Sequence, residues 1–276
     1  MAALLALGSA LSFGVSDIAG AVASRRCSAL VVTLGIQISG FLILLPALVL
    51  LGGTLSWRAL LLGAVAGTLG NLGLVLYLRS MAVGPVGVIS PISALVGAAV
   101  PVAWGVGIAG DTLGAGQSLG VLAGLVAVVL VAWAPGASLR AYGSRGPLVA
   151  LVAGVLFGLF FVALDATPPE SGLWPLVGAR LAGTGMILVL LATVRRVAPD
   201  RPALGLMMLS GATDMLANLL FLLATRAGLL SLASLLSSLY PVVALVLARF
   251  LLHERLTPLQ AGGVALALGA TALLVG

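Results

Sequence analysis

The stretch Leu206–Arg226 reads LMMLSGATDMLANLLFLLATR, and it is long and apolar enough to cross a bilayer as one helix. Asp214 and Asn218 stand near its middle, four residues apart, so they share one face of that helix, which Phe221 continues. A carboxylate at membrane depth costs about 2.5–3.5 kcal/mol and normally faces a protein interior or a wet cavity. Arg180 lies at the centre of another apolar segment and is the obvious partner. These residues predict a polar site inside a bundle of membrane helices.

The composition of the whole chain is that of a membrane protein. Of its 276 residues, 62% are hydrophobic and only 7% are charged, whereas soluble domains are about 25% charged. Since a spanning helix needs about 20 apolar residues, the chain has room for about ten of them and for no soluble domain. We expect a multi-pass protein of the cell membrane.

The net charge of +6 comes from arginine alone, because the chain has no lysine. The arginines stand singly or in pairs at the ends of apolar runs, which indicates topology signals and contacts with membrane lipids, and not a nucleic-acid surface. Cys27 is the single cysteine and His253 the single histidine. This inventory excludes an intrachain disulfide and offers no usual metal or hydrolytic site, so we expect no cofactor and no enzymatic activity.

The apolar pattern predicts an all-α protein, because lipid offers the backbone no hydrogen-bond partners and helices satisfy their own. The predicted spans are 3–23, 29–51, 60–81, 86–108, 117–134, 148–166, 173–194, 203–225, 229–252 and 259–275. A polar connection with several glycines, 135–146, separates the fifth span from the sixth.

Residues of the first half recur in the second half at a constant spacing. Phe13 matches Phe157 (157 − 13 = 144), and Gly67 matches Gly211 at the same distance. The sequence therefore predicts two five-helix repeats, residues 1–134 and 147–276, joined by 135–146. An odd number of spans forces the second repeat into the membrane upside down. This inverted arrangement is typical of secondary transporters, whose substrate site lies near the middle of the membrane between the repeats.

Each half ends its fourth span with a related turn. The second half carries His253-Glu254-Arg255-Leu256-Thr257, followed by Gln260 and Gly263, and the first half carries Gly110-Asp111-Thr112-Leu113, followed by Gln117 and Gly120. Together with the repeat and the number of spans, these turns resemble the EamA-like branch of the drug/metabolite transporter superfamily. The first turn departs from the family pattern at Thr112, where arginine is usual. The resemblance implies an exporter of amino acids, nucleosides, other small metabolites or toxic compounds.

Two indications of membrane orientation disagree. The odd-numbered connections hold most of the arginines, and the positive-inside rule then places both termini outside the cell. The family resemblance implies that both termini lie in the cytoplasm.

Arg180, Asp214 and Asn218 are the first candidates for the substrate site. Arg180 would bind an anionic group of the substrate, and Asp214 would bind a cationic group or a proton. The alternative is a buried ion pair that only holds two helices together.

Further polar candidates lie in the first half and at the end of the sixth span. Asp17 continues a polar stripe along the first span and could bind substrate or a coupling proton, and Asp165 could bind a coupling proton. The alternative for both aspartates is a position at the membrane interface with access to solvent. Gln37 and Asn71 would hydrogen-bond the substrate or a neighbouring helix.

Aromatic and proline residues complete the set of candidates. Four aromatic side chains would line a cavity or, alternatively, pack between helices or at the membrane interface: Phe13, Trp104, Phe157 and Tyr240. Three prolines would act as hinges for transport or leave harmless kinks: Pro91, Pro101 and Pro241.

The function that these features favour is secondary active or facilitative transport of a small organic solute by alternating access. The protein would act as a monomer or homodimer, with protons as a candidate coupling ion. The alternatives are a membrane-embedded lipid-modifying enzyme and a membrane scaffold that transports nothing.

Overall fold

The computed structural model describes residues 1–83, 86–132, 145–193, 199–251 and 257–275, without the side chains of 78–83, 86–91, 145–147, 248–249 and 251. Every regular element in these ranges is a helix. Within these ranges, ten helical stretches are long and apolar enough to span a membrane, which confirms the predicted number. The helices are α1 (Ala2–Ser24), α2 (Ala29–Leu51), α3 (Trp57–Val83), α4 (Val86–Trp104), α5 (Ala115–Ala132), α6 (Arg145–Asp165), α7 (Trp174–Ala192), α8 (Arg201–Ala227), α9 (Leu230–Ser237), α10 (Tyr240–Leu251) and α11 (Pro258–Val275).

The predicted spans agree with these helices to within a few residues, except in the ninth span. That span is broken into α9 and α10 by a turn at Ser238 and Leu239. Pro241 is the second residue of α10, a position where its missing N–H leaves no helical hydrogen bond unmade. The interruption predicted at Pro241 is therefore present, and it lies just before the proline.

Pro101 behaves differently, because α4 continues past it to Trp104 and then passes into a π-helical turn, η1 (Gly105–Ala109). Gly110 ends this turn with a φ of 83°, a left-handed conformation that favours glycine. Pro91 lies inside α4 without a break in the helix. The connection predicted at 135–146 lies mostly outside the described residues, and α6 begins at Arg145.

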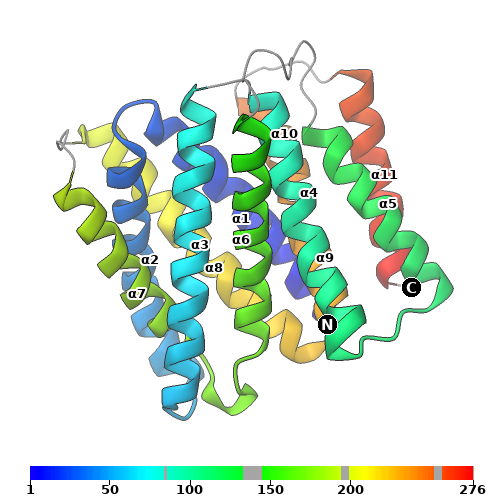
Figure 1. The fold of residues 1–276 in the computed structure, drawn as a ribbon, viewed down its shortest axis with the longest axis horizontal. Coiled ribbons are helices and arrows are strands. Elements are labelled where there is room, and N and C mark those ends of the chain that lie inside the picture. The colour runs from blue at the N-terminus through cyan, green and yellow to red at the C-terminus, as the bar shows by residue number, and fades with distance from the viewer. Residues whose placement is uncertain (84–85, 133–144, 194–198, 252–256, 276) are drawn as a thin grey trace.

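The helices pack in pairs that relate one half of the chain to the other (Figure 1). Helix α1 packs on α8 as α6 packs on α3, and α3 packs on α7 as α8 packs on α2. Helix α4 packs on α6 as α9 and α10 pack on α1, while α5 lies against α11. Most of the large helix contacts therefore join the two halves, and they come in matching pairs.

Two glycines show this correspondence at single residues. Gly67 of α3 lies against the backbone of Ala179 in α7, so closely that a methyl group would overlap the Ala179 carbonyl oxygen. Gly211 of α8 lies in the same way against the backbone of Ile36 in α2. Ile36 and Ala179 are also separated by nearly the repeat length (179 − 36 = 143). The sequence repeat thus coincides with a repeated contact, which requires glycine because the two backbones touch.

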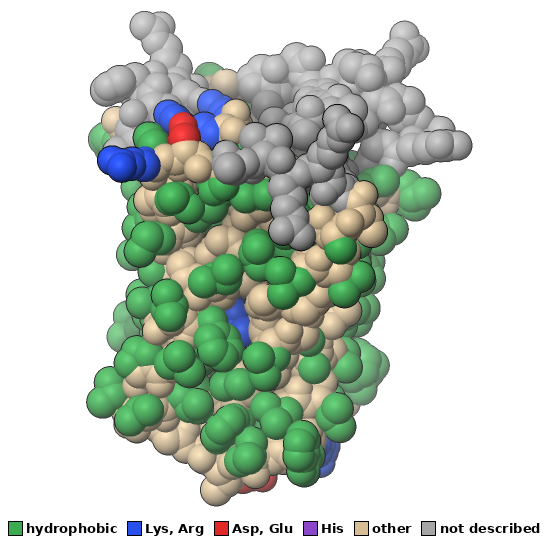
Figure 2. Space-filling model, turned by 90° about the vertical axis from the view of Figure 1, so that its left-hand side faces the viewer, with side chains coloured by type: hydrophobic (Ala, Val, Ile, Leu, Met, Phe, Trp, Pro, Cys, Tyr) green, Lys and Arg blue, Asp and Glu red, His purple; other side chains and the backbone are tan. Residues whose placement is uncertain are grey.

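The outer face of the bundle is largely apolar between its two ends, and the interior is most densely packed at the end that holds the termini. Apolar side chains cover the outer face in Figure 2 apart from one basic side chain in a gap at mid-height, and charged groups gather at the two ends. Leu50 on α2, for example, is 83% exposed, as suits a side chain that faces lipid. Inside, the large buried side chains come mainly from helix ends near both chain termini: Leu164, Leu173, Leu176, Phe221, Leu222, Leu235 and Leu236. The end of the bundle that holds the termini is therefore densely packed.

Candidate functional site

A cavity of about 150 Å³, measured as the space open to the centres of water molecules, lies inside the bundle. Its walls come from both halves of the chain, on α1 to α4, on α6 to α8, and on α10 with the turn before it. Nine of the ten residues predicted for the substrate site line it: Phe13, Asp17, Gln37, Asn71, Phe157, Arg180, Asp214, Asn218 and Tyr240. Ser238 and Tyr240 place the break between α9 and α10 at the cavity wall.

Arg180 joins three helices at one side of the cavity. From the middle of α7, its Nη1 donates a hydrogen bond to Oε1 of Gln37 on α2, and its Nη2 donates to Oδ2 of Asp214 on α8. The guanidinium is buried, and it passes over Gly40 of α2, where any larger side chain would overlap it. The predicted pair of Arg180 and Asp214 is therefore formed, with Gln37 as a third partner. A buried ion pair needs such additional hydrogen bonds to offset its loss of water.

Asn218 extends this network by one turn of α8. Its Nδ2 donates to the backbone oxygen of Asp214 at 2.7 Å and to Oδ2 of the same residue at 3.2 Å. The two acceptors fix the orientation of the amide, because only the NH₂ group can donate to them. Oδ1 of Asn218 is buried and has no hydrogen-bond partner in the described part of the chain. A buried acceptor without a partner is costly, so this oxygen suits a donor that arrives with a ligand.

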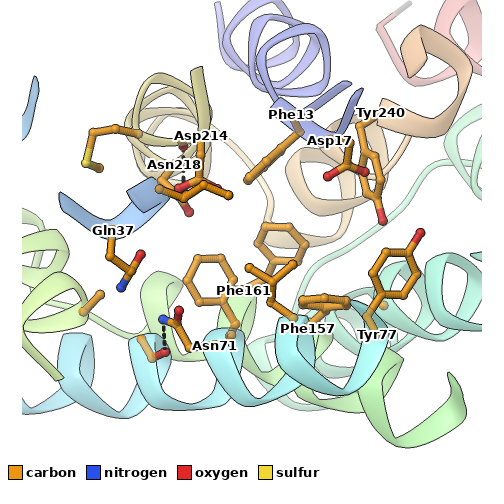
Figure 3. A pocket seen from close by; sticks show the side chains of 18 of the residues that line it. Phe13, Asp17, Gln37, Asn71, Tyr77, Phe157, Phe161, Asp214, Asn218 and Tyr240 are labelled. Carbon is orange, nitrogen blue, oxygen red and sulfur yellow. Dashed lines mark hydrogen bonds between the residues drawn. The ribbon is translucent and has the colours of Figure 1, made fainter. Parts of the chain in front are cut away.

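Asn71 on α3 faces the same side of the cavity. Its Nδ2 donates to the backbone oxygen of Gly67, one turn earlier, at 2.7 Å, and its oxygen points toward the open space (Figure 3). The amides of Asn71 and Gln37 both lie against Gly183 of α7, where a methyl group would displace them. The lack of a side chain at Gly183 thus makes room for two polar groups between three helices.

The other side of the cavity is aromatic and contains a second carboxylate. Figure 3 shows Asp17 of α1 beside Tyr240, with Tyr77 nearby. The ring of Phe13 lies 6.1 Å from that of Tyr240, and the ring of Phe157 lies 6.0 Å from that of Tyr77. Among the described residues, Asp17 has no hydrogen-bond or ion-pair partner, although it lines the cavity. Asp17 is therefore the carboxylate whose charge the protein leaves unmatched here.

Two candidates from the sequence lie elsewhere. Trp104 ends α4, is 38% exposed and does not line the cavity, so its position suits the membrane interface. Asp165 ends α6 and is also outside the cavity wall. His253 and Glu254, in the second of the two related turns, lie outside the described residues.

Sequence reasoning missed several cavity residues, among them Tyr77, Ser93, Phe160 and Phe161. For Phe161 a signal existed, because it occupies the position 144 residues after Asp17. The Ser93 hydroxyl is buried and has no partner in the described part of the chain. No pattern in the sequence separates a small polar residue of this kind from one that only packs.

No group of three or more His, Cys, Asp or Glu side chains that could hold a metal ion occurs within the described ranges. The polar groups of the cavity are instead amides, hydroxyls, two carboxylates and one guanidinium, which suit an organic molecule.

Comparison with known proteins agrees with this architecture. The sequence profile of the EamA-like transporter family matches residues 144–276, and it confirms the resemblance seen in the sequence. A crystal structure of a protein with 19% sequence identity superposes with a TM-score of 0.81, covering 99% of this chain and 98% of the other. At that identity the likeness establishes the fold. No protein of curated function matches the chain in sequence.

Proposed function

We propose that this protein, whose residues 144–276 match the EamA-like transporter family, moves a small organic solute across the membrane through the cavity between its two halves. The observation that carries this proposal is the cavity itself. Charged and amide side chains meet there inside a bundle whose outer face in Figure 2 is largely apolar between its two ends. Ionisable groups at membrane depth are costly, and they normally mark the path of a substrate or an ion.

Alternating access is the mechanism that the helix packing favours. The paired contacts of Gly67 and Gly211 indicate two halves of related structure that could rock against each other. The packed region at the end that holds the termini would separate the cavity from that side of the membrane. The turn between α9 and α10 would serve as a hinge, since it lies at the cavity wall and lacks continuous helical hydrogen bonds.

The proposal extends to a secondary active or facilitative exporter in the cell membrane. Its solute would be an amino acid, a nucleoside or a drug-like molecule, held by the network of Arg180, Asp214, Asn218, Gln37 and Asn71. Asp17 and Asp214 are the groups that would exchange a coupling proton. The cavity, with a volume of about 150 Å³, leaves room for a small organic solute that displaces water from it.

Flux into proteoliposomes tests the proposal directly. Purified protein is reconstituted, and uptake of labelled amino acids, nucleosides and cationic drugs is compared with uptake into empty liposomes. We expect Arg180→Ala and Asp214→Asn each to reduce flux by about tenfold or more, because each removes part of the site.

A matched control is the exposed ion pair of Arg26 and Asp200, whose closest atoms lie 3.0 Å apart and which does not line the cavity. Arg26→Ala should leave flux within about twofold of the original protein, since exposed pairs contribute little. The site assignment fails if Arg180→Ala and Asp214→Asn transport as well as this control. The transporter proposal fails if no solute crosses faster than through empty liposomes.

A further inference from the structure

The charges around the cavity point to the chemical class of the solute. Resting on the proposed function, we propose that the solute is an organic cation with an apolar body, and that Asp17 is its counter-ion in the cavity.

The first argument is the balance of charge. Among the described side chains, Arg180, Asp214 and Asp17 are the charged groups at the cavity wall. Arg180 is already paired with Asp214, so its positive charge is not available to Asp17. When both carboxyl groups are ionised, the described wall carries a net charge of −1. A cationic solute would restore neutrality in a region where an unpaired charge is costly.

The second argument is the kind of hydrogen bonding that remains unused. Both terminal nitrogens of Arg180 already donate to Gln37 and Asp214. The groups without a partner in the described part of the cavity include the Asp17 carboxylate and Oδ1 of Asn218, which only accept hydrogen bonds, and the Ser93 hydroxyl, which can accept or donate. A protonated amine brings N–H donors and a positive charge together, which suits acceptors of this kind and the negative charge of Asp17.

The third argument is the shape of the wall around Asp17. Phe13 and Tyr240 come from α1 and α10 and stand beside the carboxylate, and Phe161 lies next to Phe13 at a ring distance of 6.3 Å (Figure 3). Aromatic faces attract cations and also cover apolar groups. The same wall would accept a hydrocarbon or aromatic body attached to the charged nitrogen.

A zwitterionic amino acid fits these observations less well than an amine. Its carboxylate would need a cationic partner, and the Arg180 guanidinium is already shared between Gln37 and Asp214. An anionic solute would lie close to the unmatched charge of Asp17. The cavity should therefore bind amines, zwitterionic amino acids and anions with different affinities. Compounds that share one apolar body but differ in charge can test this inference.

The experiment measures binding to the purified full chain in phosphatidylcholine nanodiscs by isothermal titration calorimetry. Three sets of probes are used, with phenyl, indolyl and octyl bodies, and each set contains an amine, its α-amino acid and its carboxylic acid. We expect the amines of at least one set to bind about tenfold or more tightly than their partners at neutral pH. Asp17→Asn should abolish this preference, and Asp17→Glu should keep part of it.

The control variant is Asp165→Asn, which removes a carboxyl group outside the cavity and should leave amine affinity unchanged. Thermal unfolding of each variant shows that it is folded. The inference is overturned if no amine binds better than its partners, or if folded Asp17→Asn binds amines as the original protein does. Flux of a neutral or anionic solute that amines do not inhibit would also overturn it and leave the transporter proposal standing. Amine binding without flux of any solute would contradict the transporter proposal alone.

Discussion

Asp111 and Ser231 join the two halves of the chain at the end of the bundle that holds both termini. Oδ2 of Asp111, in the turn before α5, accepts a hydrogen bond from the backbone N–H of Ser231 at 2.8 Å and another from its hydroxyl. Ser231 is the second residue of α9, and the N-cap residue Leu229 has no side-chain group that could cap the helix. A carboxylate from the first half therefore satisfies the N-terminus of a helix in the second half.

This contact should hold the terminal end of the bundle closed. We expect Asp111→Ala to weaken closure by about 1–2 kcal/mol, the usual cost of losing a helix cap. A cysteine placed at the buried position Ser234 of α9, in a Cys27→Ser background, reports on opening through its rate of reaction with a water-soluble maleimide. The rate should rise roughly five- to thirtyfold in the Asp111→Ala variant, if opening is in fast equilibrium.

Asp111→Asn is the matched control, because asparagine also caps helix N-termini and keeps an acceptor oxygen. Its reaction rate should rise less than that of Asp111→Ala. Equal rates in the original protein and in Asp111→Ala would mean that this contact does not stabilise closure.

The ion pair of Arg180 and Asp214 should show strong coupling in stability. Removing one partner of a buried pair leaves the other charge uncompensated, at a cost of about 3–5 kcal/mol. Because Asp214 faces a cavity that water can enter, we expect a value toward the lower end. Thermal unfolding in detergent should therefore show a larger fall in Tm for Arg180→Gln alone than for Arg180→Gln combined with Asp214→Asn. A double variant that is less stable than either single one would contradict this coupling.

The close contact at Gly67 should tolerate no larger residue. A methyl group there would overlap the carbonyl oxygen of Ala179, so either α3 or α7 must shift. We expect Gly67→Ala to destabilise the protein by about 1–3 kcal/mol, and Gly211→Ala to do the same at the equivalent contact with α2. Gly185→Ala is the matched control on α7, because nothing lies within 4 Å of the position that its methyl group would take. The comparison uses Tm in one detergent, and equal values for Gly67→Ala and Gly185→Ala would refute the close packing.

The sequence predicted the fold well because each spanning helix must be apolar over its whole length. Polar residues inside such a helix are conspicuous for the same reason, and this is how Arg180, Asp214 and Asn218 could be predicted to lie together. Their contact with Gln37 could not be predicted, since it depends on how α2 and α7 meet. Trp104 was wrongly expected at the cavity, because the sequence around an aromatic residue in an apolar helix is the same whether it faces a cavity, another helix or the membrane interface.

The capping of α9 by Asp111 also could not be predicted from the sequence. The acidic residue of the first turn was visible as a partial match to a family pattern, but its partner lies 120 residues away in the chain. Similarly, Pro241 predicted an interruption of the ninth span, while the position of the break at Ser238 depends on the helices packed around it.

The distribution of arginine predicts the orientation of the bundle. Arg25, Arg26 and Arg201 lie at the end opposite to both termini, whereas Arg58 and Arg226 lie at the terminal end. The positive-inside rule therefore places the termini outside the cell, with the contact of Asp111 and Ser231 on the outer side. An epitope tag before Met1 should be removed by protease added to intact spheroplasts.

A second tag, inserted in the connection at 135–146, provides the internal control, because an odd number of spans separates it from Met1. It should survive protease in intact spheroplasts and disappear when they are lysed. The opposite pattern would place both termini in the cytoplasm, as the family resemblance implies. The cavity would then be separated from the cytoplasm, and not from the outside, by the packed region at the terminal end. The direction from which a solute reaches Asp17 in this conformation follows from that single measurement.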